Sequence, residues 1–204
     1  MLSYDESLKI LKETNALLEG HFILSSGLHS KQYVQCAKLL SYPQKAEIIC
    51  SSLCKKINEN FNKIDIILSP AIGGIVVGYE VGRQLERETI FAERSNGSLI
   101  LRRDFKIKEN LNVLIVEDVI TTGKSVLECA KIVEINKAKL LGYACIIDRS
   151  NKEVLINNKI VSLIKLEIKT FKENELPDEL KKIAPIKPGS SNPSKWKKKD
   201  LVWI

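Results

Sequence analysis

The segment from Val113 to Ser125 constrains the fold more than any other part of this 204-residue chain. Val113 to Val116 form a continuous apolar run rich in β-branched residues, typical of a parallel strand covered on both faces. Glu117 and Asp118 follow, and the loop from Thr121 to Ser125 then leads into a helical pattern. This order predicts a strand–loop–helix unit of an α/β sheet, in which ligands bind beyond the carboxyl ends of the strands.

The chemistry of this segment indicates a ribose phosphate as its ligand. Gly123 allows a positive φ angle or a close backbone approach, so the loop N–H groups can surround an anion. The N-terminus of the helix that follows adds a partial positive charge. The two carboxylates suit the hydroxyls of a sugar.

A nucleotide-binding P-loop is the competing interpretation, because Gly123-Lys124-Ser125 looks like the end of that motif. The motif requires a glycine five positions before Gly123, and Asp118 stands there instead. A carboxylate at that position would repel a nucleoside triphosphate. The sequence therefore disfavours a P-loop.

Strand-like and helix-like segments alternate along the chain, which predicts an α/β fold with a doubly wound parallel sheet. Expected helices cover residues 3–18, 43–61, the stretch after the loop 69–74 to about 85, and 124–135. Expected strands cover 64–68, 89–92, 113–118, 140–147 and 161–168, with a hairpin at 22–33.

The length fits one domain over residues 1–204. Within it we expect a core sheet at 41–170, a small lobe built from 1–40 and the C-terminal tail, and a projecting hairpin arm at 93–111. Asn96-Gly97 is a hairpin-turn signal, and few residues of this flexible arm have a core pattern.

Composition narrows the class of protein. The apolar fraction is 44% and the charged fraction 28%, and no apolar run approaches the roughly 20 residues that span a bilayer. The start of the chain lacks a signal-peptide pattern, so we expect a cytoplasmic protein without a membrane partner. The net charge of +7 includes lysines at 195–199, but a solvated tail is favoured over a nucleic-acid partner.

The cysteines and histidines do not form a recognisable metal motif. The five cysteines contain no C-x-x-C pair, and we expect free thiols. Cys50 and Cys54 lie one helical turn apart, so we expect them on the apolar face of a helix, in the protein core. His21 and His29 are too few and too isolated in the sequence for a metal site.

Residues Glu117 to Ser125 resemble the phosphoribosyl-pyrophosphate motif of the type I phosphoribosyltransferases. The resemblance implies that Glu117 and Asp118 hold the ribose hydroxyls, with Asp118 as a catalytic residue, and that the loop cradles the 5′-phosphate. The implied donor-binding residues are Glu117, Asp118, Val119, Ile120, Thr121, Thr122, Gly123, Lys124, Ser125, Arg94 and Gly73.

A second loop, Ser69 to Ile75, also follows a strand and opens a helix. Its glycines would let backbone N–H groups reach an anion, and it resembles the pyrophosphate loop of the family. A plain turn is the equal alternative. Many relatives carry a lysine where this chain has Gly73. The glycines that recur every four residues at 74, 78 and 82 favour close helix–sheet packing instead.

The chain as a whole resembles the orotate branch of the family. Phe22 to Tyr33 is similar to the orotate-recognition segment, although a surface hairpin is the alternative, and Ser25 stands where many relatives have lysine. Arg149 resembles an arginine that contacts orotate; a surface ion pair is its alternative. The implied orotate-binding residues are Ser25, Ser26, Gly27, Tyr33, Thr121 and Arg149.

The arm departs from the common pattern, because Glu93 to Arg103 contains no lysine or histidine. It resembles a short-arm variant branch, which also has a Lys-Pro-Gly-Ser sequence as at Lys187 to Ser190. Arg94 is then the candidate for the pyrophosphate contact and the second catalytic residue.

The resemblance implies a pentosyltransferase that joins orotate to the phosphoribosyl group in pyrimidine biosynthesis. It also implies a homodimer, and Mg²⁺ held mainly by the substrate with Glu117 and Asp118 nearby and no direct protein ligand. Two alternatives stay open: a phosphoribosyltransferase for another base, and a regulator that keeps the phosphoribosyl site but binds nucleic acid.

Overall fold

The computed structural model describes residues 1–24, 26–150 and 156–188 of the chain. It divides into two compact units. The larger unit contains residues 1–16 and 36–167, and the smaller one contains residues 17–35 and those from 168 onward. Residues 1–16 and 36–40 therefore belong to the larger unit, whereas the sequence had suggested that they join the small lobe.

A six-stranded sheet with the order β5-β4-β3-β6-β7-β8 forms the centre of the larger unit. All neighbours are parallel except β4 and β5, which form an antiparallel hairpin. The strands are β3 (Ile66–Pro70), β4 (Glu88–Ser95), β5 (Ser98–Leu101), β6 (Asn112–Ile120), β7 (Lys139–Asp148) and β8 (Ile160–Lys165).

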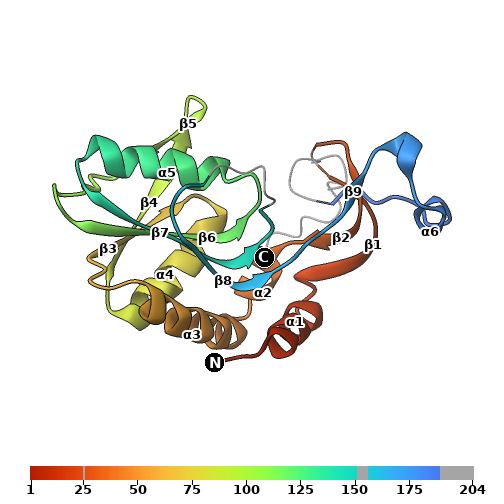
Figure 1. Ribbon diagram of the computed structural model, residues 1–204, viewed down its shortest axis with the longest axis horizontal. Coiled ribbons are helices and arrows are strands. Elements are labelled where there is room, and N and C mark those ends of the chain that lie inside the picture. The colour runs from red at the N-terminus through yellow and green to blue at the C-terminus, as the bar shows by residue number, and fades with distance from the viewer. Residues whose placement is uncertain (25, 151–155, 189–204) are drawn as a thin grey trace, which may run out of the picture. The chain divides into compact units, whose positions relative to one another are not determined.

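Helices cover both faces of this sheet, as the alternation of elements predicted. In Figure 1, α5 lies on one face, and α3 and α4 lie on the other. The helices of the larger unit are α1 (Tyr4–Glu13), α2 (Cys36–Leu40), α3 (Pro43–Asn60), α4 (Gly73–Leu85) and α5 (Lys124–Ile135). The doubly wound α/β fold is confirmed.

The direction in which successive strands are added to the sheet reverses between β3 and β6. The chain leaves β3 toward β4 on one side and leaves β6 toward β7 on the other, while β3 and β6 themselves pair through Ile66↔Val113 and Leu68↔Ile115. Such a switch point opens a crevice beyond the carboxyl ends of the two strands, because the connections diverge there. The ligand site is therefore expected after Pro70 and after Ile120.

The core is built from alternate residues of the central strands. Leu68, Ile115 and the α5 residues Val126 and Cys129 are buried in one cluster, and the intervening strand residues face the opposite side because a strand alternates. On α3, Cys50, Leu53 and Cys54 are buried. All five cysteines are buried free thiols, as expected.

Helix α4 packs closely on β3 and β4 through glycines. A Cβ atom at Gly78 would overlap the Ser69 hydroxyl, and one at Gly82 would overlap the Thr89 hydroxyl. The predicted packing role of this glycine repeat is confirmed, since no larger residue fits between helix and sheet here.

The smaller unit is a three-stranded antiparallel sheet in the order β1-β2-β9. It contains β1 (Leu17–Ile23), β2 (His29–Val34), β9 (Thr170–Phe171), the 3₁₀ helix η1 (Glu173–Glu175) and α6 (Asp178–Lys181). The predicted hairpin at 22–33 is thus present as the β1–β2 pair. Its pairing is irregular between Glu19 and Phe22, where β1 holds one extra residue.

Two expectations about local structure were wrong. The first helix does not run to residue 18: α1 ends at Glu13, and Gly20 lies in β1 instead of stopping a helix. The arm does contain core residues. Leu99 and Ile107 are each 5% exposed and belong to the same buried cluster as Val126 and Cys129 of α5. The hairpin turn at Asn96-Gly97 is present.

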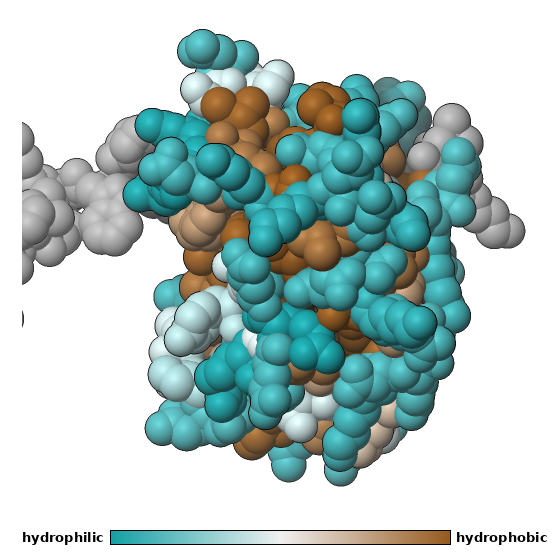
Figure 2. Space-filling view, turned by 90° about the vertical axis from the view of Figure 1, so that its left-hand side faces the viewer, coloured by the Kyte–Doolittle hydropathy of each residue, from teal (hydrophilic) through white to brown (hydrophobic). Residues whose placement is uncertain are grey.

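Polar residues dominate the surface in view. On the face drawn in Figure 2, hydrophilic side chains predominate and hydrophobic ones lie between them. Among the helices of the described residues, none combines the length and the apolar character needed to cross a membrane.

Candidate active site

Two carboxylates mark the end of the central strand β6. Glu117 is 8% exposed and Asp118 is partly buried. The backbone N–H of Val119 donates to Asp118 Oδ1 at 2.9 Å, and the N–H of Asp118 makes a longer contact of 3.4 Å with Glu117 Oε1. These are few hydrogen bonds for two carboxylates at one site, so each keeps lone pairs for a ligand.

The pair is held in a state that disfavours negative charge. Burial raises the pKa of the Glu117 carboxyl well above its ordinary value, and the neighbouring Asp118 raises it further. Burial also raises the pKa of Asp118. A cation or hydroxyl donors bound beside these two acids would stabilise their ionised forms. Such a shift at the switch point of an α/β sheet is the property expected of a functional site.

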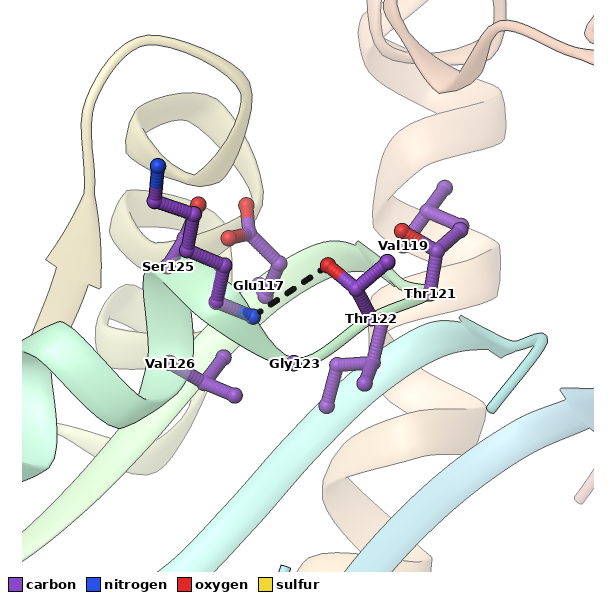
Figure 3. A pocket seen from close by; sticks show the side chains of 9 residues that line it. Glu117, Val119, Thr121, Thr122, Gly123, Ser125 and Val126 are labelled. Atoms are coloured by element: carbon purple, nitrogen blue, oxygen red, sulfur yellow. Dashed lines mark hydrogen bonds between the residues drawn. The ribbon is translucent and has the colours of Figure 1, made fainter. Parts of the chain in front are cut away.

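The loop after β6 forms a small open pocket of about 50 Å³. Glu117, Thr122, Gly123 and Ser125 are among the residues that line it (Figure 3). Gly123 has a φ of 73° and is the N-cap residue of α5, so the left-handed conformation that glycine favours turns the chain into the helix. The backbone N–H of Lys124 points to the Thr122 hydroxyl at 3.5 Å. The pocket therefore combines a helix N-terminus with hydroxyl groups, as a phosphate site requires.

The remaining residues of this segment belong to the strand and the pocket wall. Ile120 is buried and pairs with Asp148 of β7, while Val119, Thr121 and Lys124 line the same pocket. The structure therefore brings Glu117 and the predicted donor-binding residues 119–125 together around one opening.

The loop after β3 lies against the two acids. A Cβ atom at Gly73 would come within 2.9 Å of Asp118 Oδ1, and one at Gly74 within 3.1 Å of Glu117 Oε1. The peptide between Ala71 and Ile72 is cis. Gly73 thus lies beside the Asp118 carboxylate, and a side chain at this position would crowd it.

Thr121 and Arg149 lie next to each other at the ends of neighbouring strands. Ile120 pairs with Asp148, and the N–H of Arg149 donates to the Ile120 carbonyl at 2.8 Å. The buried Asp148 carboxylate accepts from the backbone and the hydroxyl of Ser150 at 2.8 and 2.6 Å. Two of the predicted orotate-binding residues are therefore neighbours.

Arg94 of the arm binds a residue that the sequence had not singled out. Its guanidinium forms an ion pair with Glu128 of α5 at 3.1 Å and donates to the Gly97 carbonyl at 2.5 Å. Glu128 also accepts from the backbone N–H of Leu99 at 3.0 Å. The carboxylate of Glu128 therefore ties the hairpin to α5. The signal for this contact in the sequence was a charged residue, Glu128, between the apolar residues Leu127 and Cys129 of the predicted helix.

The other predicted orotate-binding residues lie in the smaller unit. Gly27 has a φ of 83° in the turn between β1 and β2, where Ser26 Oγ accepts from Leu28 N at 3.4 Å. Tyr33 of β2 packs on Phe22 with ring centroids 5.8 Å apart. Ser25, the residues 189–190 of the Lys-Pro-Gly-Ser sequence and the lysines at 195–199 lie outside the described residues.

Comparisons with known proteins agree with this architecture. A family model described as a phosphoribosyl transferase domain matches residues 41–180. A relative named orotate phosphoribosyltransferase from Caldicellulosiruptor bescii is 47% identical over 189 residues, which cover 93% of this chain and 98% of the relative. One with the same name from Caldicellulosiruptor saccharolyticus is 46% identical over 183 residues, covering 90% and 95%.

Solved structures share the fold at low identity. Orotate phosphoribosyltransferase from Aeropyrum pernix has a TM-score of 0.68 at 23% identity, over 78% of this chain and 93% of that one. Adenine phosphoribosyltransferase from Thermoanaerobacter pseudethanolicus has a TM-score of 0.59 at 19% identity, over 66% and 88%. The fold is thus shared by enzymes named for different bases.

Proposed function

Since this chain belongs to the phosphoribosyltransferase family, we propose that it transfers the phosphoribosyl group of 5-phosphoribosyl 1-diphosphate to orotate. The bond between ribose C1 and the diphosphate oxygen breaks, and diphosphate leaves with the electron pair of that bond. A bond from orotate N1 to C1 forms, the N1 proton is released to solvent, and orotidine 5′-phosphate is the product. The observation that carries this proposal is that Glu117 lines the pocket formed by the loop after β6, while Gly74 and Gly73 of the neighbouring loop lie against Glu117 and Asp118.

In this proposal the donor lies across the carboxyl ends of β3 and β6. The 5′-phosphate occupies the pocket at 121–125, where the N-terminus of α5 favours an anion. The ribose hydroxyls donate to Glu117 and Asp118, and the diphosphate lies at the Gly73 loop. The distance between the two loops is set by the sheet, so the donor is held without rearrangement of the core.

Positioning and charge account for the reaction. As the bond from C1 to the diphosphate lengthens, positive charge develops on the ribose ring, and the carboxylate of Asp118 stabilises it while holding the hydroxyls. Arg94 would neutralise charge on the leaving diphosphate once it exchanges Glu128 for that group. No side chain has to form a covalent bond to the substrate.

A magnesium ion fits this donor set. Glu117 and Asp118 are hard oxygen ligands whose raised pKa values a nearby cation would lower. Among the described residues, no cluster of three or more His, Cys, Asp or Glu side chains could hold a metal ion. We propose that the ion is bound mainly by 5-phosphoribosyl 1-diphosphate, with Glu117 and Asp118 nearby, where it would supply positive charge to the diphosphate.

The proposed orotate-binding residues of the larger unit are Thr121 and Arg149, and those of the smaller unit are Ser26, Gly27 and Tyr33. A guanidinium at a strand end can pair with a carboxylate or carbonyl through two parallel hydrogen bonds. The turn offers the hydroxyl of Ser26. Tyr33 would support the turn through its packing on Phe22.

A homodimer is part of the proposal, supported by exposed apolar side chains on α4 and the residue that precedes it. Ile72, Val76 and Tyr79 are 85%, 49% and 67% exposed at helical spacing. An apolar stripe of this kind is typical of a subunit contact. Sedimentation equilibrium tests it, with two chains expected. We also place the enzyme in the cytoplasm, because its highly charged donor does not cross membranes.

The decisive experiment follows orotate absorbance in the presence of 5-phosphoribosyl 1-diphosphate and Mg²⁺. We expect turnover with orotate and none with adenine, guanine or uracil. Turnover with another base and not with orotate would contradict the assignment of the acceptor. Absence of turnover with every base would contradict the proposed activity.

A further inference from the structure

The two histidines of the chain lie side by side in the smaller unit. His21 and His29 are 3% and 6% exposed, and His21 Nε2 is 2.6 Å from His29 Nδ1. Their ring centroids are 4.9 Å apart. A pair of buried imidazoles is costly unless both are hydrogen-bonded, and nothing in the proposed chemistry requires them.

The irregularity in β1 is what brings the two rings together. Glu19 pairs with Gln32, but Phe22 pairs with Ser30 and Ile23 with His29, so β1 contains one extra residue. In a regular antiparallel ladder His21 would oppose Ser30 and point away from the face that carries His29. Gly20 permits the bulge, with a φ of 156° and a Cβ position 3.3 Å from the Phe22 ring.

The hydrogen bonds of the pair run in one direction. His21 Nδ1 lies 2.8 Å from the Ile183 carbonyl, which can accept and cannot donate. Nδ1 of His21 therefore carries a proton, and in the tautomer without a second proton on that ring, Nε2 accepts and His29 donates from Nδ1. This series of hydrogen bonds connects β2, β1 and the segment after α6.

The backbone of His21 holds the same segment. The N–H of Ile186 donates to the His21 carbonyl at 2.8 Å, and the N–H of Ile23 donates to the Ile186 carbonyl at 2.9 Å. An ion pair between Lys31 of β2 and Glu179 of α6 adds a further link. The residues 183–186, here called the supporting segment, are thus tied to β1, and α6 just before them is tied to β2.

We propose that His21 and His29 are positioning residues that fix the turn between β1 and β2 for the recognition of orotate. His29 directly follows the turn. The residue before it, Leu28, accepts at its carbonyl from the N–H of Leu24 and so closes the turn. A fully satisfied network of buried hydrogen bonds rigidifies the elements that it joins, and an apolar pair would not. This inference rests on the proposed function, because orotate is the ligand that the turn would recognise.

The test compares His29→Leu with His29→Asn in the full chain. Leucine fills the space but leaves His21 Nε2 without its donor, whereas the asparagine amide keeps a donor near the position of Nδ1. For His29→Leu we expect the KM for orotate to rise about tenfold, since about one buried hydrogen bond is lost. Both kcat at saturating orotate and the KM for the donor should stay within about twofold, and His29→Asn should restore the KM for orotate.

A second pair of variants applies if His29→Leu does not fold. Ile186 is 52% exposed, so Ile186→Pro removes the N–H that donates to His21 without touching the core, and Ile186→Ala keeps it. The proline variant alone should raise the KM for orotate. An unchanged KM, or equal effects on both substrates, overturns the inference, whereas a wild-type chain that does not turn over orotate overturns the proposed function itself.

Discussion

Gly73 and Asp118 lie so close that a Cβ atom on the glycine would come within 2.9 Å of the carboxylate oxygen Oδ1. The first residue of α4 and the end of β6 are thereby joined in one site, although they lie far apart in the sequence. This contact explains why the loop after β3 begins its helix with two glycines.

The substitution Gly73→Ala should displace the Asp118 carboxylate and leave the fold intact. Alanine is the better helix former at this position, and the group it meets is the end of a flexible side chain. We expect kcat/KM for the donor to fall about tenfold, with an unfolding temperature no lower than that of the wild type. Steady-state kinetics and a thermal melt measure both. Full activity would contradict the role of this contact.

Glu117 should cost the free protein stability at neutral pH. Its folded-state pKa is raised to about 9, above its unfolded value. Below about pH 4 both states hold the proton, and above that pH the unfolded state ionises first. The stability of the wild type should therefore fall as pH rises from about 4 to about 9.

The variant Glu117→Gln removes this loss, because glutamine does not ionise. We expect it to be more stable than the wild type by about 1–3 kcal/mol at pH 7, with the difference vanishing near pH 4, and to bind the donor more weakly. Urea unfolding at several pH values measures it. A variant less stable than the wild type at pH 8 would contradict the cause assigned to the raised pKa.

Substitutions of Arg94 and of Glu128 should change the KM for the donor in opposite directions. If Arg94 leaves Glu128 to bind diphosphate, then Glu128→Gln frees the arginine while its amide oxygen still accepts from Leu99. We expect the KM for the donor to fall about two- to fivefold in Glu128→Gln, as befits a partly exposed ion pair, and to rise in Arg94→Gln. A rise in both variants would contradict the exchange of partners.

Removal of Mg²⁺ should abolish turnover without unfolding the protein. The ion is proposed to be bound mainly by the donor, and its absence would leave diphosphate charge facing two carboxylates. With EDTA we expect the rate to fall at least about 100-fold, with recovery on adding Mg²⁺ and an unchanged circular dichroism spectrum. Undiminished turnover in EDTA would contradict the proposed role of the metal.

Local patterns were sufficient to predict most of the core. The helix at 124–135 was predicted with the bounds of α5, and Glu117 lines one pocket with the loop at 119–125, as their order implied. These features depend on residues close in sequence. A run of β-branched residues followed by a glycine loop has few other ways to bury its apolar side.

Features that depend on distant pairing were not predictable in this way. The bulge at Gly20 reverses which side of β1 faces inward, so His21 and His29 seemed isolated although they are in contact. Leu99 and Ile107 are buried because α5 and the sheet edge cover them, which no local pattern in the arm records. The Arg94–Glu128 pair likewise joins elements 34 residues apart.

Direct measurement of donor binding in the absence of any base tests the central claim. Calorimetry with 5-phosphoribosyl 1-diphosphate and Mg²⁺ should give one donor bound per wild-type chain. The Asp118→Asn variant, with the same circular dichroism spectrum, should bind the donor at least about tenfold more weakly and lose most of its turnover. Equal affinity and full turnover in Asp118→Asn would contradict the account.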